Sequence, residues 1–205
     1  MFITFEGIDG CGKSTQLKLV NEYFISKGIK TLLIREPGGT NFSEKIREIL
    51  LSHSSDMTNI SELLLFASAR NSLVSNVIEP AISNNIVVIS DRFYDSTTAY
   101  QGFGRGLDLK QVEAINQIAT NGLKPDLTFY LKLTVEEANQ RSKYRQKDRI
   151  EDAGNHFFEN VIIGYDTIAD TEPERVKVIP AKNSISHTNK LILEIIKNFE
   201  NNEIH

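Results

Sequence analysis

A glycine-rich segment near the start of the chain ends in a lysine and two hydroxyl side chains. Residues 7–14 fit the pattern G-x-x-x-x-G-K-[ST] without a mismatch. Glycines at these positions let successive backbone N–H groups turn inward around phosphate oxygens. Lys13 adds a mobile cation for the β- and γ-phosphates, and the Ser14 hydroxyl is a natural Mg²⁺ ligand. The segment therefore predicts an ATP-binding phosphate loop. Its expected nucleotide contacts are Gly7, Ile8, Asp9, Gly10, Cys11, Gly12, Lys13, Ser14 and Thr15.

An acidic and a basic side chain follow an apolar run further along the chain. Asp91 and Arg92 come directly after the run 86–89 and Ser90. A carboxylate at the end of a strand can hold Mg²⁺ through water, and a guanidinium can neutralise charge on a phosphoryl group in transfer. Alone, such a pair is more often a surface ion pair. Beside a phosphate loop, the functional interpretation is favoured.

Two other patterns could serve a phosphoryl acceptor and its transfer. Phe66 and Arg70 stand at i and i+4 of a predicted helix, where a ring could stack on a base and a guanidinium could bond a base carbonyl. Residues 140–149 hold five cations. The plainer alternatives are a core phenylalanine beside a solvated arginine, and a solvated basic stretch.

Short apolar runs and longer amphipathic stretches alternate along the chain and must position these groups. Strands are expected at 2–5, 31–34, 86–89, 127–133 and 176–179, because these runs are apolar and scarcely alternate. Helices are expected at 14–26, 43–51, 61–83, 109–121, 135–144, 155–169 and 188–199. This order predicts an α/β fold: a three-layer P-loop NTPase sandwich with a five-stranded parallel sheet flanked by helices. Ligands should bind at the carboxyl ends of the strands.

Length and composition limit the classes of protein to consider. The chain has 205 residues and a net charge of −4, which suits one domain over 1–205 and argues against a protein that coats nucleic acid. One cysteine, Cys11, excludes a disulfide framework and is more readily explained as a small inert loop residue than as a redox switch. We find neither a membrane-length apolar run nor a signal peptide and expect a soluble, cytoplasmic protein without membrane partners.

The phosphate loop alone does not distinguish kinases from other nucleotide hydrolases. A GTPase should carry Asn-Lys-x-Asp after a later strand, and neither 124–126 nor 181–184 fits that pattern. Motor and transport ATPases are usually larger. A short chain that begins with its phosphate loop is therefore best explained as a small-molecule kinase.

Five further segments identify the kind of kinase that the chain resembles. They are Arg35-Glu36-Pro37-Gly38-Gly39, Leu65-Phe66-Ala67-Ser68-Ala69-Arg70, Asp91-Arg92-Phe93 with Ser96-Thr97-Thr98-Ala99-Tyr100-Gln101-Gly102, Asn121-Gly122-Leu123-Lys124-Pro125-Asp126-Leu127-Thr128, and Asp148-Arg149-Ile150-Glu151. Together they resemble the bacterial thymidylate kinases of the P-loop nucleoside-monophosphate kinase superfamily. The likeness runs in order from residue 2 to about residue 165, while the last forty or so residues share only a strand–helix pattern.

The resemblance implies roles for individual residues. It implies an acceptor-binding helical region over about 35–105 and a short basic lid over about 136–151. Phe66 would stack on thymine, Arg70 would contact its O4, Thr97 and Gln101 would read the base edge, and Tyr100 would crowd the sugar 2′ position. Asp9 would contact the 3′-hydroxyl, and the acceptor phosphate would meet Arg35, Arg92 and Arg47, beside Glu36 and Pro37. Because the phosphate loop lacks arginine, the family pattern assigns catalytic charge to Arg145 and Arg149, with Arg141 flanking adenine.

The expected function is therefore phosphorylation of dTMP to dTDP with ATP and Mg²⁺, in dTTP biosynthesis. Lys13, Arg92, Arg145 and Arg149 are the expected catalytic residues, and Ser14 and Asp91 the expected metal ligands. The family implies a homodimer, and no nucleic acid partner is expected. Two alternatives stay open at this point: another nucleoside-monophosphate or deoxynucleoside kinase of the same fold, and a non-catalytic nucleotide-binding regulator.

Overall fold

The protein is built around one parallel sheet. The structure is a computed structural model that describes residues 1–53, 56–142 and 148–202. Its strands are β1 (Phe2–Glu6), β2 (Thr31–Arg35), β3 (Val87–Asp91), β4 (Leu127–Lys132) and β5 (Val176–Pro180). They lie in the order β2-β3-β1-β4-β5, and every neighbouring pair is parallel. The predicted five-stranded parallel sheet is confirmed, with each strand within two residues of its expected bounds.

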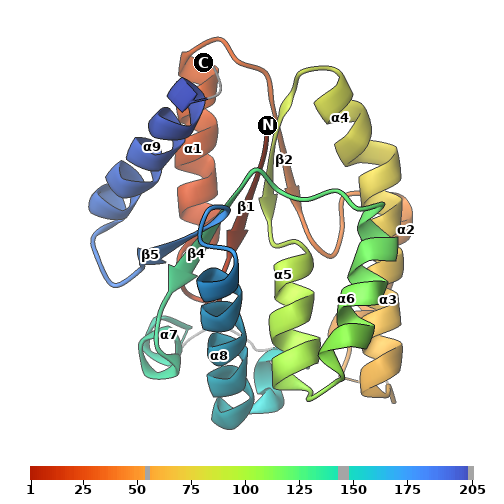
Figure 1. Ribbon diagram of the computed structural model, residues 1–205. Coiled ribbons are helices and arrows are strands. Elements are labelled where there is room, and N and C mark those ends of the chain that lie inside the picture. Colours follow the sequence, from red (N-terminus) through yellow and green to blue (C-terminus); the bar gives the residue numbers. More distant parts are fainter. Residues whose placement is uncertain (54–55, 143–147, 203–205) are drawn as a thin grey trace.

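Helices cover both faces of this sheet and form a three-layer sandwich (Figure 1). On one side lie α1 (Lys13–Ser26) and α9 (Ile185–Asn202), and the other side carries α8 (Asn155–Thr171) and the helices of the region between β2 and β4. These are α2 (Asn41–Leu51), α3 (Asn59–Leu73) with its continuation through η1 (Val74–Ile78) and α4 (Glu79–Ser83), α5 (Tyr94–Thr97) with η2 (Thr98–Gly104), and α6 (Leu109–Thr120). A short α7 (Val135–Ser142) and the turn η3 (Glu151–Ala153) flank residues 143–147.

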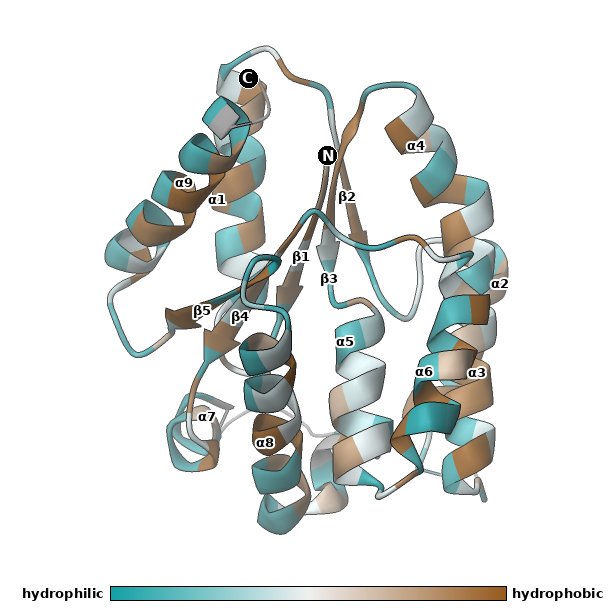
Figure 2. Ribbon diagram, viewed as in Figure 1, coloured by the Kyte–Doolittle hydropathy of each residue, from teal (hydrophilic) through white to brown (hydrophobic). Residues whose placement is uncertain are grey.

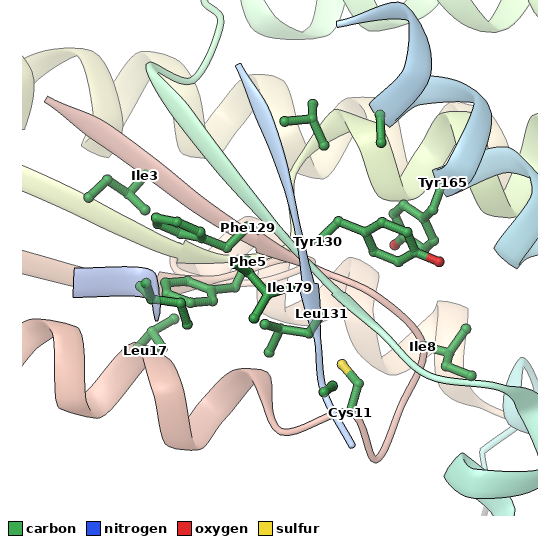
Figure 3. Close-up of a cluster of buried hydrophobic side chains, with 14 of the residues drawn as sticks. Ile3, Phe5, Ile8, Cys11, Leu17, Phe129, Tyr130, Leu131, Tyr165 and Ile179 are labelled. Atoms are coloured by element: carbon green, nitrogen blue, oxygen red, sulfur yellow. The ribbon is translucent and has the colours of Figure 1, made fainter. Parts of the chain in front are cut away.

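The core lies where strand side chains meet α1 on one face and α8 on the other. Figure 2 shows hydrophobic residues concentrated on the strands, as expected for strands covered on both faces. Figure 3 shows Phe5 near Leu17 of α1, while Tyr130 stacks on Tyr165 of α8 with ring centroids 5.0 Å apart. Cys11 closes the end of this cluster and is 3% exposed, so it is a packing residue. Among the described residues, no helix is both long and apolar enough to cross a membrane.

One helical segment is absent from the expected elements. Residues 94–104 form α5 and η2, although this stretch is polar and β-branched and has no clear helical period. Tertiary contacts hold it: Asp95 pairs with Arg175, and α8 approaches closely at Gly164, where a Cβ atom would lie 2.9 Å from Ala99 Cα. The segment is consequently fixed above the strand ends, with Thr97, Tyr100 and Gln101 on it.

Candidate active site

The phosphate loop joins β1 to α1 at the carboxyl edge of the sheet. Gly7 packs against β4 so closely that a Cβ atom there would lie 2.6 Å from the Leu131 carbonyl oxygen. Gly12 has a φ of 97° and directly precedes α1, so backbone N–H groups at the start of this helix face the loop. Lys13 is the first residue of α1, and its Nζ donates to the carbonyl oxygens of Gly7 and Ile8 at 2.9 and 3.3 Å. The ammonium group thus lies inside the loop.

The end of β3 lies beside this loop because β3 pairs with β1 in parallel. Ser14 Oγ donates to Asp91 Oδ2 at 3.2 Å. The pair offers a hydroxyl oxygen and a carboxylate oxygen, which are the ligand types that Mg²⁺ takes in proteins. No group of three or more histidine, cysteine and carboxylate side chains suited to a metal occurs among the described residues. A magnesium ion at Ser14 and Asp91 would accordingly depend on phosphate oxygens and water for its other ligands.

A cavity of about 260 Å³ opens next to the loop at the ends of β1, β2 and β3. Its wall contains all eleven residues that the sequence predicted to bind the acceptor: Asp9, Arg35, Glu36, Pro37, Arg47, Phe66, Arg70, Arg92, Thr97, Tyr100 and Gln101. Ser14 and Asp91 line the same cavity. The fold therefore brings the predicted acceptor residues, from five segments of the chain, to one place beside the phosphate loop.

Arg70 is buried in the cavity wall, so the alternative of a solvated charge does not hold. It is 2% exposed, and its Nε donates to Glu36 Oε2 at 2.7 Å. Its two terminal nitrogens donate to Asn116 Oδ1 and to the Phe93 carbonyl oxygen, each at 3.2 Å. Burial raises the pKa of Glu36, while the Arg70 charge opposes that rise. Phe66 is half-buried: it packs against the core and also lines the cavity.

Arg92 is held above the end of β1 by several polar groups. Its Nη2 donates to Asp9 Oδ1 at 3.1 Å, and its Nη1 donates to Ser96 Oγ at 3.1 Å and to Tyr165 Oη at 3.2 Å. The guanidinium carbon also lies 5.0 Å from the centroid of the Tyr100 ring. The backbone of Arg92 has a φ of 74°. The side chain is thereby placed between the phosphate loop and the acceptor cavity.

Below Arg92 lies Glu6, a carboxylate that the sequence analysis did not single out. Glu6 accepts hydrogen bonds from the Phe93 N–H at 2.7 Å, from Ser96 Oγ at 2.6 Å and from Tyr165 Oη at 2.9 Å. Burial, reinforced by the charge of Asp95, raises the pKa of Glu6 to about 7, although Arg92 opposes the rise. Glu6 ties the start of α5 to β1 and supports the hydroxyl groups that contact Arg92. Its place directly before the phosphate loop was the only sequence signal for it.

Three buried polar atoms of residues in the cavity wall have no hydrogen-bond partner among the residues that the structure describes. They are Thr97 Oγ1, Glu36 Oε1 and Tyr100 Oη. Leaving such an atom buried and unpaired costs about 1–3 kcal/mol. A ligand that supplies a donor or acceptor to these atoms would recover this cost, so the three atoms mark polar contacts for a bound molecule.

The basic lid is described only in part. Arg141 lies beside the phosphate loop, where Nη2 donates to the Ala181 carbonyl oxygen at 2.8 Å and Nη1 to that of Gly10 at 3.4 Å. Arg149 is not among the residues that line the acceptor cavity; its Nη2 donates to Glu62 Oε2 at 2.6 Å and its Nε to the Leu50 carbonyl oxygen at 3.0 Å. Arg145 falls within 143–147, outside the described residues.

Several residues of the site were not anticipated from the sequence. Ser96, Leu51, Asp148 and Ile150 also line the cavity. Tyr165, Asn116 and Glu62 stand behind lining residues and bond to them. Ser96 and the pair Asp148 and Ile150 lie inside segments that the sequence had marked. The three supporting residues join the site only through the fold, since each lies more than 35 residues from its partner along the chain.

Comparisons with known proteins agree with one another. A family model described as thymidylate kinase matches residues 5–192. The chain is 51% identical to a thymidylate kinase of Prosthecochloris aestuarii over 96% of this chain and 92% of the relative, and 42% identical to one of Thermoanaerobacter pseudethanolicus over 97% and 98%. The fold is similar to a crystal structure of thymidylate kinase from Ehrlichia chaffeensis, with a TM-score of 0.78 and 33% identity over 96% of this chain and 98% of that one.

Proposed function

This chain belongs to the thymidylate kinase family and phosphorylates dTMP with ATP, and from that premise we propose that the cavity beside the phosphate loop is its dTMP site. The observation that carries the proposal is the cavity wall, which unites the eleven predicted acceptor residues and includes three buried polar atoms without partners among the described residues. The family assignment decides against the two alternatives that the sequence left open, a kinase for other nucleotides and a non-catalytic regulator.

We propose that the base lies between the aromatic and polar walls of the cavity. Phe66 would stack on thymine, Arg70 would donate to O4, and Thr97 and Gln101 would contact the base edge. Tyr100, whose ring lies under the Arg92 guanidinium, would border the sugar, and Asp9 would accept from its 3′-hydroxyl. The phosphate would meet Arg35, Arg47 and Arg92, the three cations in the wall outside the Arg70–Glu36 pair, beside Glu36 and Pro37.

The proposed chemistry depends on position and charge. The attacking atom is an oxygen of a phosphate monoester, which is largely ionised near neutral pH, so no general base is needed. Lys13 and Arg92 flank the path from the loop to the cavity and would stabilise charge on the transferring group. Magnesium held by Ser14 and Asp91 would neutralise phosphate charge. Arg141, beside the loop, would flank adenine.

We also propose that lid arginines complete the charge stabilisation. The proposal assigns this role to Arg145 and Arg149, and it rests on the sequence pattern. In the structure Arg149 is bonded to Glu62 and Leu50, so its guanidinium must release both partners before it can act on phosphate.

The stacking role of Phe66 provides the test of the cavity. Phe66→Ala should weaken dTMP binding by about 5- to 150-fold, since stacking of a base on an aromatic ring is worth about 1–3 kcal/mol. ATP affinity should stay within about twofold. Titration calorimetry with each nucleotide measures both values.

A matched variant separates stacking from packing. Phe199 of α9 is also partly buried against the core and lies outside the cavity wall. Phe199→Ala should lower thermal stability and leave dTMP affinity unchanged. Equal losses of dTMP and ATP affinity in Phe66→Ala would show that this ring only supports the fold, and the proposed site would be wrong.

We propose further that two copies of the chain pair through the neighbouring helices α2, α3 and α6. These helices pack together and expose large apolar side chains: Phe42, Ile49, Ile60, Leu64 and Ile118. Ile118 is the most exposed of these five side chains, at 75%, and exposed apolar patches are typical of protein–protein contact sites.

Light scattering should give a dimer mass for the unaltered chain and a monomer mass for Ile118→Glu, because a buried, unpaired charge opposes association. Ile163 of α8 is also exposed and lies outside these helices, so Ile163→Glu should stay dimeric. A monomeric unaltered chain, or a monomer with both variants, would contradict the proposed interface.

Two broader properties complete the proposal. We propose that residues 1–205 act as one domain, since all five strands belong to one sheet. We propose a cytoplasmic enzyme, a location that fits a buried, reduced cysteine inside the phosphate loop and substrates that are intracellular nucleotides.

A further inference from the structure

Glu62 of α3 is a buried carboxylate that gathers donors from three separate segments. It is 1% exposed. Its Oε1 accepts from Gln101 Nε2 at 2.9 Å and from Arg105 Nε at 3.1 Å. Its Oε2 accepts from Arg105 Nη2 at 3.2 Å and from Arg149 Nη2 at 2.6 Å. Burial alone would raise the pKa of Glu62, but the bonds from Arg105 and Gln101 outweigh it and keep the pKa below its ordinary value. The group is therefore ionised near neutral pH.

An ionised carboxylate fixes the orientation of any amide that contacts it. A carboxylate has acceptors only, so the Gln101 side chain must turn its NH₂ group, and not its carbonyl, toward Glu62. The two heteroatoms of an amide branch from one carbon, and the carbonyl oxygen therefore lies on the other branch. Gln101 is 1% exposed and lines the acceptor cavity, so it cannot reverse its amide in exchange for water. Glu62 therefore determines which of the two amide branches of Gln101 holds the NH₂ group and which holds the carbonyl oxygen.

The polarity of this amide bears on which pyrimidine can bind. Thymine and uracil carry an N–H at ring position 3, whereas cytosine has a bare nitrogen acceptor there. A carbonyl oxygen accepts from the former and is unpaired and repulsive beside the latter. Glu62 itself lies outside the cavity wall, so it acts on the base only through Gln101.

We infer that Glu62 is a positioning residue for base specificity: it holds the Gln101 amide with its carbonyl oxygen toward the base, and so selects pyrimidine nucleotides that have an N–H at position 3. This inference rests on the proposed function, in which Gln101 contacts the base edge. It adds the residue that decides whether Gln101 accepts or donates the hydrogen bond to the base.

Glu62→Gln tests the inference, because an amide at position 62 can donate as well as accept and thus lets Gln101 turn over. Dissociation constants for dTMP, dUMP and dCMP are measured by calorimetry. The ratio of the dCMP constant to the dTMP constant should fall about tenfold in the variant. The ratio for dUMP to dTMP should stay within twofold, since both bases carry the N–H.

Arg105→Gln is the matched control. It removes two hydrogen bonds and one charge from the same carboxylate, and leaves the Gln101 contact in place. Arg105 does not line the cavity, and both ratios should be unchanged in this variant. If Glu62→Gln does not fold, the double variant Glu62→Gln/Arg105→Gln, which restores the charge balance, is compared with Arg105→Gln instead.

Three outcomes overturn the inference. In the first, Glu62→Gln weakens the binding of all three nucleotides by one common factor. In the second, neither ratio of dissociation constants changes. In the third, both the single and the double variant fail to fold. Each would assign Glu62 to the fold alone. Gln101→Met separates the inference from its premise. Unchanged nucleotide affinities in Gln101→Met would show that Gln101 does not contact the base. If the ratio of the dCMP to the dTMP dissociation constant falls in Gln101→Met but not in Glu62→Gln, only the inference about Glu62 is wrong.

Discussion

Lys13→Ala is expected to lower kcat for dTMP phosphorylation by about 10²- to 10³-fold, the loss typical when one preorganised charge-stabilising donor is removed. Lys13 is 6% exposed, and its Nζ lies within the phosphate loop between the carbonyl oxygens of Gly7 and Ile8. No other described lysine lies in the loop or lines the acceptor cavity. Steady-state ADP release at saturating dTMP measures the effect.

The control for this variant lies on the same helix. Lys18 of α1 is exposed, and Lys18→Ala should leave kcat unchanged. Circular dichroism should show the same helix content in both variants, because Lys13 is the first residue of α1 and supports no later turn. A fall of less than about tenfold in kcat for Lys13→Ala, or about 1.4 kcal/mol, would contradict its assignment to the phosphates.

Asp95→Ala should lower the free energy of unfolding by about 3–5 kcal/mol, the usual cost of removing one partner of a buried ion pair. Asp95 is 2% exposed and accepts from two nitrogens of Arg175, at 2.7 and 3.0 Å. Glu172 also accepts from Arg175, which places the expected loss toward the lower end of this range. Urea unfolding followed by circular dichroism measures the change.

A second aspartate in an ion pair of equal length isolates the effect of burial. Asp166 accepts from Lys132 Nζ at 2.7 Å, but both side chains are more than a third exposed. Asp166→Ala should cost less than about 1 kcal/mol, as exposed pairs do. Similar losses for the two variants would show that burial is not what makes the Asp95 pair matter.

Loss of Asp95 should also reach the acceptor site, since this residue anchors the segment that carries Thr97, Tyr100 and Gln101. The expected effect on the site comes from displacement of these three side chains, and not from removal of a group that contacts dTMP. The segment itself could not be predicted as a helix, because its turns are held by Arg175, by Asn116 and by packing on Gly164, and not by a periodic apolar stripe. The strands, by contrast, are short apolar runs, and their burial on both faces can be predicted from their composition.

The same distinction applies to the site. Residues that act through a local pattern, such as the phosphate loop and the pair of Phe66 and Arg70, could be proposed from spacing and family likeness. The burial of Arg70 could not, because its partner Glu36, directly after β2, is 34 positions away along the chain and is brought to Arg70 of α3 only by the fold. Glu62 was missed for the same reason, since its donors come from η2, the following turn and the end of the lid.

The left-handed backbone at Arg92 sets thermodynamic stability against activity at a single position. This conformation costs a residue with a Cβ atom about 1–2 kcal/mol, and glycine adopts it without that cost. Replacement of Arg92 by glycine would remove this backbone cost, but it would also remove the guanidinium that pairs with Asp9 and lies over Tyr100. Glycine at position 92 would therefore relieve the backbone cost and at the same time remove the arginine at the centre of the site, together with the three hydrogen bonds that it donates.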